Sequence, residues 1–582
     1  MQTKHSIPLT YFFRYFRPYL TMVILTFVFL IGARVALTFD PLILKKIIDA
    51  VSTKSPLGVA ASLLLLYFGL RLISNLLEFL RDYVYSPVMM GVSRDIEMAV
   101  FDHLLKLPVS YHADQRAGNA SRALARGSRA IGFVLDFSIS QILPPMFELL
   151  FVTILLLKLY SWQFGVVTLG TIVFYAWFTI WSTEKRTKFR FQGNAKDDNA
   201  SGVLVDSIAN IDTVKFFNNE QLMFDMFAKL KEEWLKLMVK NNRLFAAVYS
   251  GQGVILLIGL GFILTLAVKQ AILGTMTVGD LVLVSTYIVR LSGPITTLGF
   301  VYGQFKNSFA DLDTMARILN QDIEVKEPKQ PVAIDKPNGN IVFDQVNFNY
   351  VGRVKTIHNL SFKVKSGEKI AFVGPSGSGK STIARLLFRL YDINSGKILI
   401  DGVDVTKLDG ATRKKILSIV TQEPTLFNDS IADNIRFGNP EATDEQVKEA
   451  ATTAGIADFI EGLPDKYQTL VGERGIKLSG GEKQRVAIAR ALIRDPKIII
   501  FDEATSNLDS RTEKAIQEAL ANAASGRTAL TIAHRLSTIT SSDMIYVLDK
   551  GEIKEQGTHQ ELLAKDDLYA KLWAIQSKNP DA

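Results

Sequence analysis

The hydrophobic positions of the first 320 residues gather into six apolar stretches, and each is long enough to cross a bilayer as a helix. The six predicted spans are Tyr19–Phe39, Leu57–Leu80, Phe133–Tyr160, Trp162–Trp181, Tyr249–Val268 and Val278–Tyr302. From residue 341 onward the pattern changes to the short apolar runs and amphipathic stretches of a soluble α/β domain. We therefore predict an α-helical six-span transmembrane domain over residues 1–320, fused to an α/β domain.

The polar segments between the second and third spans and between the fourth and fifth are long and keep helical periodicity. Residues 81–130 and 182–247 carry 7 and 11 Lys or Arg, against 5 in the three short connections. The positive-inside rule therefore places both long segments and both termini in the cytoplasm. A bacterial inner (plasma) membrane is the simplest location for such a multi-pass chain.

The long polar segments predict long cytoplasmic helix extensions. A single helix over Leu57–Leu107 would be about 75 Å long, against a hydrocarbon core of about 30 Å. At the tips of these extensions lie Tyr111–Gly118 and Phe217–Phe227. Each is either a docking site for a soluble domain or a plain helical hairpin tip.

Several charged or polar side chains fall inside or beside the apolar spans, where a lone charge is costly and usually faces a cavity. Arg186 and Arg190 lie four residues apart at the inner end of the fourth span, so they share one helix face and together could bind an anionic group. Snorkelling to the lipid headgroups is the alternative. Gln252 in the fifth span is equally ambiguous. The other charged candidates are Arg34, Arg71, Glu148 and Arg290.

Composition narrows the function classes. The net charge of +8 could suggest nucleic acid, but many basic residues flank apolar spans, as expected of a membrane protein, so we expect no nucleic-acid partner. The chain has no cysteine, which excludes a disulfide framework and thiolate metal sites. A Pro-rich and charged stretch marks residues 321–340 as a linker, so the soluble domain covers residues 341–582.

The strongest chemical motif is GPSGSGKST at Gly374–Thr382, which fits the G-x-x-x-x-G-K-[ST] phosphate-binding loop. It lies between a short apolar run suited to a buried strand, Ile370–Val373, and a stretch with helical spacing. Backbone amides at a helix N-terminus can hold phosphates, Lys380 can reach the β and γ phosphates, and Ser381 is placed to hold Mg²⁺. A glycine-rich turn is the alternative for the pattern alone.

Further candidate residues follow in chain order. Tyr350 could stack on adenine or be an ordinary sheet residue, and Gln422 follows an apolar run and could ligate Mg²⁺ or position water. The sequence LSGGE, with Ser479, Gly480 and Gly481, opens a helix and offers a second anion site.

The apolar strand KIIIFDE ends in two carboxylates, at the edge where a parallel sheet presents its ligands. Asp502 is suited to hold Mg²⁺ through water, and Glu503 is suited to polarise the attacking water. The turn ending at Asp509 follows, and His534 ends a further strand, where it could contact the γ phosphate or serve as a capping or core histidine.

This order of motifs closely resembles the ATP-binding cassette (ABC) family over the whole chain, because LSGGE followed by a hydrophobic strand ending in Asp-Glu is peculiar to that family. The resemblance implies that Tyr350 stacks on adenine, Glu503 is the catalytic carboxylate and His534 is the switch histidine. It implies ATP and Mg²⁺ as cofactors. The expected catalytic residues are Glu503, His534, Gln422 and Lys380, and the expected nucleotide-binding residues are Tyr350, Gly374, Pro375, Ser376, Gly377, Ser378, Gly379, Lys380, Ser381, Thr382, Gln422, Ser479, Gly480, Gly481, Asp502 and Asp509, with Ser381, Gln422 and Asp502 holding the metal.

In that family each nucleotide lies between the phosphate loop of one subunit and the signature of the other, so one cassette per chain implies a dimer, which we expect to be of identical subunits. Six spans ahead of one cassette look like an exporter half-transporter. The segments RGSRAIGFVLDF, KRTKFR and VKFFNNE resemble the mitochondrial and bacterial transporters linked to glutathione compounds, iron–sulfur maturation and heavy-metal tolerance.

In that subfamily two arginines matching Arg186 and Arg190, and a glutamine matching Gln252, line a cavity that receives glutathione derivatives. The match departs in three places. The fifth span has Tyr249-Ser250-Gly251-Gln252 in place of N-x-G-Q, and the sixth has Pro294-Ile295-Thr296 and Tyr302-Gly303-Gln304 in place of PLN and YRE. Arg290 adds a positive charge, so an anionic or amphipathic small-molecule substrate is expected.

We therefore expect an ATP-driven exporter embedded in membrane lipid. Lipid flipping and multidrug export by the same fold are the alternatives. An ATP-gated regulatory protein is disfavoured because the signature and the catalytic carboxylate are intact.

Overall fold

The computed structural model describes residues 14–114, 117–350, 356–472, 475–502, 510–533 and 535–578. Side chains are not described at 113–122, 288, 291–303, 306, 307, 310, 510–512, 577 and 578. The chain divides into two compact units. The helical unit contains two segments of the chain, residues 1–106 and 115–321. The cassette unit contains Leu107–Asp114 and the chain from Asp322 onward.

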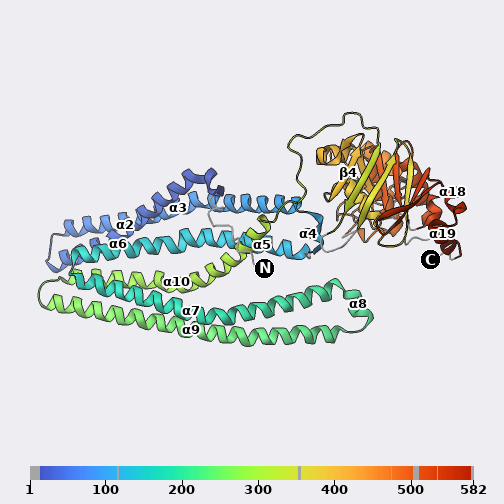
Figure 1. Cartoon of the computed structure of the whole chain (residues 1–582). Coiled ribbons are helices and arrows are strands. Elements are labelled where there is room, and N and C mark those ends of the chain that lie inside the picture. Colours follow the sequence, from blue (N-terminus) through green and yellow to red (C-terminus); the bar gives the residue numbers. More distant parts are fainter. Residues whose placement is uncertain are drawn as a thin grey trace. The chain divides into compact units, whose positions relative to one another are not determined.

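The helical unit is built almost entirely of long helices (Figure 1). In chain order its elements are η1 (Arg14–Tyr19), α2 (Leu20–Ser52), α3 (Leu57–Lys106), α5 (Ala117–Phe137), the π-helical turn η2 (Ser138–Ile142), α6 (Leu143–Leu159), α7 (Trp162–Ala209), α8 (Ile211–Phe216), α9 (Glu220–Ile272) and α10 (Val278–Leu319).

The helices are much longer than a bilayer is thick, as the sequence predicts. α3, α7 and α9 contain 50, 48 and 53 residues. Among the described residues, five helical stretches are long and apolar enough to cross a membrane. The sixth predicted span falls in α10, where the described apolar stretch is the shorter Val278–Tyr287. The chain is thus a multi-pass membrane protein with helical extensions beyond the membrane.

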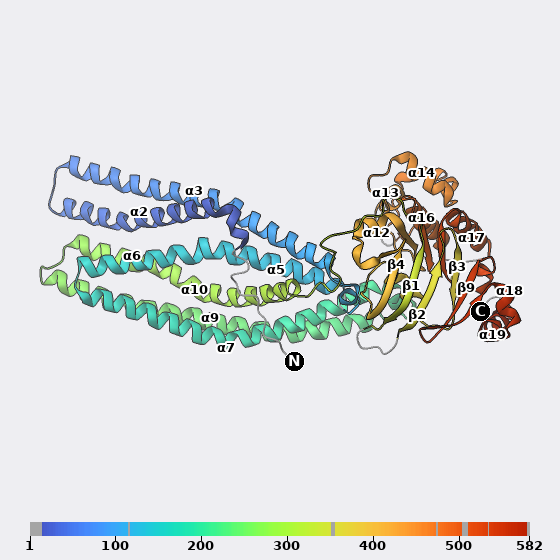
Figure 2. The same cartoon turned by 45° about the horizontal axis from the view of Figure 1, so that its top comes forward.

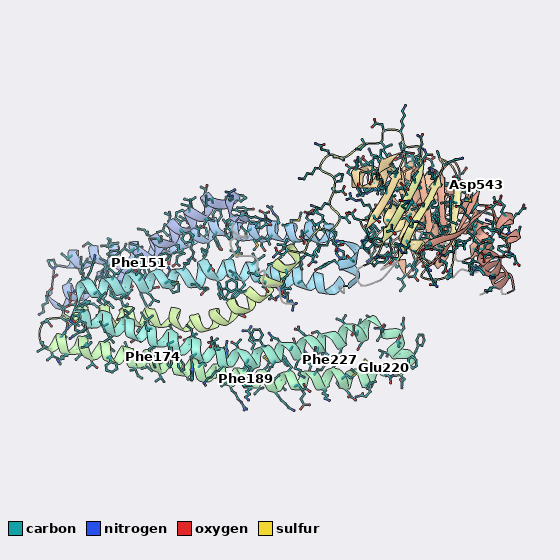
Figure 3. The ribbon with its side chains drawn as sticks, viewed as in Figure 1. Phe151, Phe174, Phe189, Glu220, Phe227 and Asp543 are labelled. Carbon is teal, nitrogen blue, oxygen red and sulfur yellow. The ribbon has the colours of Figure 1, made fainter. Side chains whose placement is uncertain are left out.

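Two long antiparallel pairs organise this unit, because α2 packs along α3 and α7 packs along α9 (Figures 1 and 2). The core on one side is formed by buried apolar side chains such as Val152, Phe164, Ile263 and Leu283. Small residues allow close approach: a Cβ at Gly259 of α9 would lie 2.5 Å from the Thr171 side chain of α7. Among the labelled side chains, Phe174 of α7 is exposed, whereas Phe189 of α7 lies next to α9, with its ring centroid 4.4 Å from Lys240 Nζ (Figure 3).

The cassette unit contains two sheets. The antiparallel sheet has the order β2-β1-β4-β5, and the second sheet has the order β10-β9-β3-β8-β7-β6. The strands are β1 (Ile341–Phe348), β2 (Ile357–Val364), β3 (Lys369–Val373), β4 (Ser395–Ile400), β5 (Val403–Asp404), β6 (Leu417–Val420), β7 (Ile498–Asp502), β8 (Thr528–Ile532), β9 (Met544–Asp549) and β10 (Glu552–Gly557).

Helices and short turns complete the cassette unit. They are α4 (Val109–Asp114), α11 (Lys380–Leu387), η3 (Val405–Lys407), α12 (Gly410–Ile416), α13 (Ile431–Arg436), α14 (Asp444–Thr453), α15 (Ala457–Glu461), η4 (Lys466–Gln468), α16 (Gly480–Leu492), α17 (Ser510–Ala524), η6 (Leu536–Ile539), α18 (His559–Ala564) and α19 (Leu568–Lys578).

The central strands β3, β8, β7 and β6 are parallel, so their carboxyl ends lie along one edge. They are mostly apolar because both faces are covered: Ile370, Phe372 and Ile500 pack into one core, and Ile499 and Phe501 pack into another. The parallel register therefore brings the phosphate loop after β3 and Asp502 at the end of β7 to the same edge of the sheet.

Candidate functional site

The phosphate loop connects β3 to α11, as predicted, and its shape requires glycine at two positions. Gly374 has φ 147°, and a Cβ there would lie 2.0 Å from the Leu548 carbonyl oxygen. Gly379, the N-cap of α11, has φ 104°, and a Cβ would lie 2.7 Å from the Ile357 side chain. Both glycines let the backbone turn so that helix α11 begins directly behind the loop.

Lys380 lies folded against this loop. Its Nζ donates hydrogen bonds to the carbonyl oxygens of Gly374 at 2.8 Å and Pro375 at 3.0 Å, and the residue is 5% exposed. The Ser378 hydroxyl is buried and has no hydrogen-bond partner in the described part of the chain. A cation and an unsatisfied hydroxyl in a loop at a helix N-terminus fit the oxygens of a nucleotide phosphate.

A pair of oxygen groups suited to Mg²⁺ lies beside the loop. Ser381 Oγ, in the first turn of α11, donates to Asp502 Oδ1 at 3.1 Å. Asp502 ends β7, so the parallel sheet brings these two residues together across 121 positions of sequence. Hydroxyl and carboxylate oxygens are the ligands that Mg²⁺ prefers, and the residues therefore fit the metal that the nucleotide carries.

Tyr350, the predicted adenine-stacking residue, follows β1 and is partly buried. Its ring meets Phe348 and Tyr391 edge to face, with centroid distances of 4.9 and 5.1 Å. Its hydroxyl lies 3.3 Å from Thr382 Oγ1 and accepts a hydrogen bond from Arg385 Nη1 at 3.3 Å. The aromatic ring is thereby attached to the first turns of α11, next to the phosphate loop. Arg385 was not among the residues predicted from the sequence, although it lies one turn beyond Ser381.

The remaining predicted nucleotide residues lie on separate elements. Gln422 is exposed in the loop after β6. Ser479 is the N-cap of α16: its hydroxyl accepts from the Glu482 amide at 3.4 Å, and the Glu482 carboxylate accepts from the Ser479 amide at 2.8 Å. This capping box leaves Ser479 and Gly480 exposed at the helix N-terminus. Glu503, Asp509 and His534 lie outside the described residues, so their predicted roles have no structural account.

In the helical unit, the two predicted arginines lie together on α7. Arg186 is 7% exposed, and its guanidinium carbon lies 4.8 Å from the centroid of the Phe245 ring on α9. Its Nε is buried and has no hydrogen-bond partner among the described atoms. Arg190 Nη2 donates to Gln304 Oε1 of α10 at 2.7 Å. In the described part of the chain, neither arginine forms an ion pair with a carboxylate.

The other two predicted substrate residues are engaged inside the chain. Gln252 is 3% exposed, and its Nε2 donates to Thr179 Oγ1 of α7 at 2.8 Å. Arg290 donates to Asp40 Oδ2 at 2.7 Å and to the Leu37 carbonyl at 2.8 Å. Its positive charge is therefore neutralised by Asp40, a partner that was not predicted from the sequence. Asp40 directly follows the first apolar stretch, and a carboxylate at that position could have indicated a partner for a charged residue in another span.

Arg290 and Asp40 are part of a larger intramembrane charge network. Asp40 also accepts from Arg71 Nε at 3.2 Å, while Arg34 pairs with Glu78 at 2.5 Å and lies 3.9 Å from Glu148. The network consists of two groups of ion pairs, one around Asp40 and one around Arg34. Together they join α2, α3, α6 and α10 and contain three cations and three carboxylates: Arg34, Asp40, Arg71, Glu78, Glu148 and Arg290. Its charges balance, so it fastens helices rather than offering a net charge to a ligand.

Comparison with known proteins gives a consistent result. Residues 23–295 match the family described as "ABC transporter transmembrane region", and residues 357–506 match the one described as "ABC transporter". The chain is 39% identical over 557 residues to the "Iron-sulfur clusters transporter ATM1, mitochondrial" of Gibberella zeae, covering 94% of this chain and 80% of that protein. It is 36% identical over 565 residues to "Heavy metal tolerance factor 1" of Caenorhabditis elegans, covering 96% and 70%.

A solved structure is similar along the whole chain. The structure described as "Structure of a bacterial Atm1-family ABC exporter with ATP bound" superposes with a TM-score of 0.85 at 38% sequence identity, covering 96% of this chain and 99% of that one.

Proposed function

Because the chain belongs to the ABC half-transporters of the Atm1 and ABCB7 type, we propose that two identical subunits form an exporter for an anionic or amphipathic compound, such as a glutathione derivative or a metal–glutathione species. The observation that carries the substrate class is the arginine pair on α7. Arg186 and Arg190 present two positive charges whose described partners are an aromatic ring and a neutral amide. A substrate with carboxylates would supply the missing negative charge.

The substrate class is also supported by the contrast with Arg290. That arginine has its own carboxylate, Asp40, whereas the α7 pair has none among the described residues. Burying an unpaired cation is costly, so two unpaired ones on one helix face favour a ligand that neutralises them. The names of the relatives refer to iron–sulfur clusters and heavy-metal tolerance, which agrees with an anionic thiol compound as cargo.

At the ATP site, the chain is a transport ATPase whose residues can be given roles. Lys380 would exchange its loop carbonyls for the β and γ phosphates, and the Ser378 hydroxyl would gain a phosphate oxygen as partner. Ser381 and Asp502 would hold Mg²⁺, which supplies charge stabilisation to the transferring phosphoryl group. We further propose that Glu503 would polarise the attacking water and that Gln422 and His534 would act on the γ phosphate.

A dimer completes this site. Ser479 and Gly480 are exposed at the positive N-terminal end of α16 and would cover the nucleotide bound to the partner. The tip of the second extension, α8, ends in exposed aromatic residues: Phe216 is 86% and Phe217 is 71% exposed. Such side chains are suited to dock on a cassette and transmit its movement. We propose an inner (plasma) membrane location with the cassettes and both termini in the cytoplasm.

The decisive measurement for the substrate is ATPase activity in lipid nanodiscs, titrated with oxidised glutathione and separately with lipids and cationic drugs. We expect stimulation by oxidised glutathione that is lost in Arg186→Ala and Arg190→Ala but kept in Arg243→Ala, an exposed arginine on α9. Stimulation by lipid or drugs alone would instead identify a lipid flippase or multidrug exporter. The internal bonds of Gln252 and Arg290 are the observation that favours this second candidate.

The catalytic assignment has its own test. The Glu503→Gln variant should still bind ATP and form the closed dimer, but it should not hydrolyse ATP. Steady hydrolysis at the wild-type rate in that variant would refute the role of Glu503.

A further inference from the structure

The loop that carries Gln422 is held by side chains of the signature helix. We define the glutamine loop as residues 421–427, between β6 and the turn that leads to α13. Gln484, in the first turns of α16, is 3% exposed and donates from Nε2 to the Thr421 carbonyl at 3.3 Å. Further along the same helix, Arg490 Nη1 donates to the Thr425 carbonyl at 3.0 Å. One helix therefore fixes the glutamine loop at both sides of Gln422.

Arg490 also binds Asn434, whose side chain forms hydrogen bonds with the last residue of the glutamine loop. Arg490 Nε donates to the Asn434 carbonyl at 2.8 Å, and its Nη2 donates to Asn434 Oδ1 at 2.8 Å. The Asn434 side chain accepts from the Phe427 amide at 2.9 Å and donates to the Phe427 carbonyl at 3.0 Å. Asn434 is 1% exposed, so water does not compete for these bonds.

Packing around Arg490 leaves it little freedom. Its guanidinium carbon lies 5.9 Å from the Phe427 ring and 5.8 Å from the Phe437 ring. Behind it, a Cβ at Gly438 would lie 2.1 Å from the Arg490 carbonyl oxygen, so the chain after α13 touches the α16 backbone directly. Burial lowers the pKa of the Arg490 guanidinium. Its described hydrogen bonds all go to amide and backbone oxygens, so its planar fork sets geometry instead of pairing with a carboxylate.

The two ends of this assembly serve different nucleotides if the proposed function holds. Gln422 faces the ATP bound to its own phosphate loop, whereas Ser479, at the N-terminus of α16, covers the ATP bound to the partner. α16 has 13 residues and is therefore about 20 Å long, and a helix of that length moves as a rigid rod. A displacement of the glutamine loop at one site must then shift the signature at the other.

We propose that Arg490, assisted by Gln484 and Asn434, is a positioning residue that couples the two ATP sites of the dimer. It fastens the glutamine loop of one site to the signature helix of the other. This inference rests on the proposed dimer. It adds that ATP binding at one site raises the affinity of the second site for ATP through these contacts.

The test is the ATP dependence of hydrolysis by the full-length protein in nanodiscs. We expect a Hill coefficient clearly above 1 for the wild type. In Arg490→Lys, which keeps the charge but loses the planar fork that reaches the Thr425 and Asn434 oxygens together, it should fall to about 1, with a larger rise in KM than fall in kcat. Gln484→Met, which keeps the chain length and loses the bond to Thr421, should lower the coefficient partly.

The matched control is Arg485→Lys. Arg485 lies on the same helix, but its Nη1 bonds to the Gly455 carbonyl, away from the glutamine loop. The control should keep the wild-type Hill coefficient. The thermal midpoint of each variant is measured as well, so that Hill coefficients are compared only among variants that are equally stable. An unchanged coefficient in both Arg490→Lys and Gln484→Met refutes the coupling while leaving the exporter intact. A chain that is monomeric in nanodiscs refutes the proposed dimer, and the coupling with it.

Discussion

Replacing Asp40 by Asn should destabilise the membrane unit more than any single change at its surface. The Asp40 side chain is 1% exposed and accepts from Arg290 at 2.7 Å and from Arg71 at 3.2 Å. Asn keeps the shape but removes the charge, so two guanidinium groups lose their common carboxylate. Arg290, whose side chain is 19% exposed, has no other carboxylate among its described ion pairs.

The expected magnitude follows from the burial of this pair. Breaking a buried ion pair by removing one partner costs about 3–5 kcal/mol, because a charge is left buried without compensation. The Arg71 side chain is 53% exposed, so solvent or headgroups can offset its part. Asn also retains one acceptor for Arg290. We therefore expect the lower end of the range, about 3 kcal/mol.

The assay is reversible unfolding by sodium dodecyl sulfate in mixed micelles, followed by tryptophan fluorescence. Asp40→Asn combined with Arg290→Gln should recover much of the loss, because the second change removes the unpaired cation. Glu232→Gln, at an exposed pair with Lys236, is the matched control and should leave the midpoint unchanged. A single Asp40→Asn variant as stable as the wild type would refute the reasoning that this network fastens the helices.

Three further predictions concern the ATP site. Gly374→Ala should weaken ATP binding by tenfold or more, about 1.4 kcal/mol, because its Cβ would overlap the Leu548 carbonyl; titration with a fluorescent ATP analogue measures this, and unchanged binding contradicts it. Ser381→Ala should raise the Mg²⁺ concentration for half-maximal hydrolysis roughly tenfold, whereas an unchanged requirement would exclude its role beside Asp502. Tyr350→Phe should keep ATP affinity and Tyr350→Ala should lose about 1–3 kcal/mol of it in the same titration; equal affinities would mean that adenine does not stack there.

Much of the architecture could be read from local pattern. The apolar stretches and the charge of the polar segments predicted membrane helices with long extensions, and the continuous α3 over Leu57–Lys106 agrees with this. The resemblance to the ABC family, the fold class and the ATPase activity are confirmed by the matched families and the similar structure. These succeed because a phosphate loop or a membrane span is specified by neighbouring residues.

The missed features all depend on partners distant in sequence. Arg290 reads as a free cation until the fold brings Asp40 to it across 250 positions. Arg490 reads as one more basic residue of the signature helix until α13 and the glutamine loop close around it. Arg186 and Arg190, the residues that we propose bind the substrate, could be singled out by their i, i+4 spacing, but their ring and amide partners come from α9 and α10.

The length of α7 makes it a lever. Its 48 residues measure about 72 Å, of which about 30 Å lies in hydrocarbon, so about 40 Å extends beyond the bilayer. A tilt of about 5° at the membrane would swing the far end, where Phe216 ends α8 and Phe217 follows it, by about 3.5 Å. Conversely, a displacement of a few ångströms at that end rotates the membrane part of α7, beside Arg186, by a few degrees and with greater force. The long helices thus convert a large displacement at their ends into a small displacement with greater force in the membrane, which suits a transport ATPase that must separate closely packed helices.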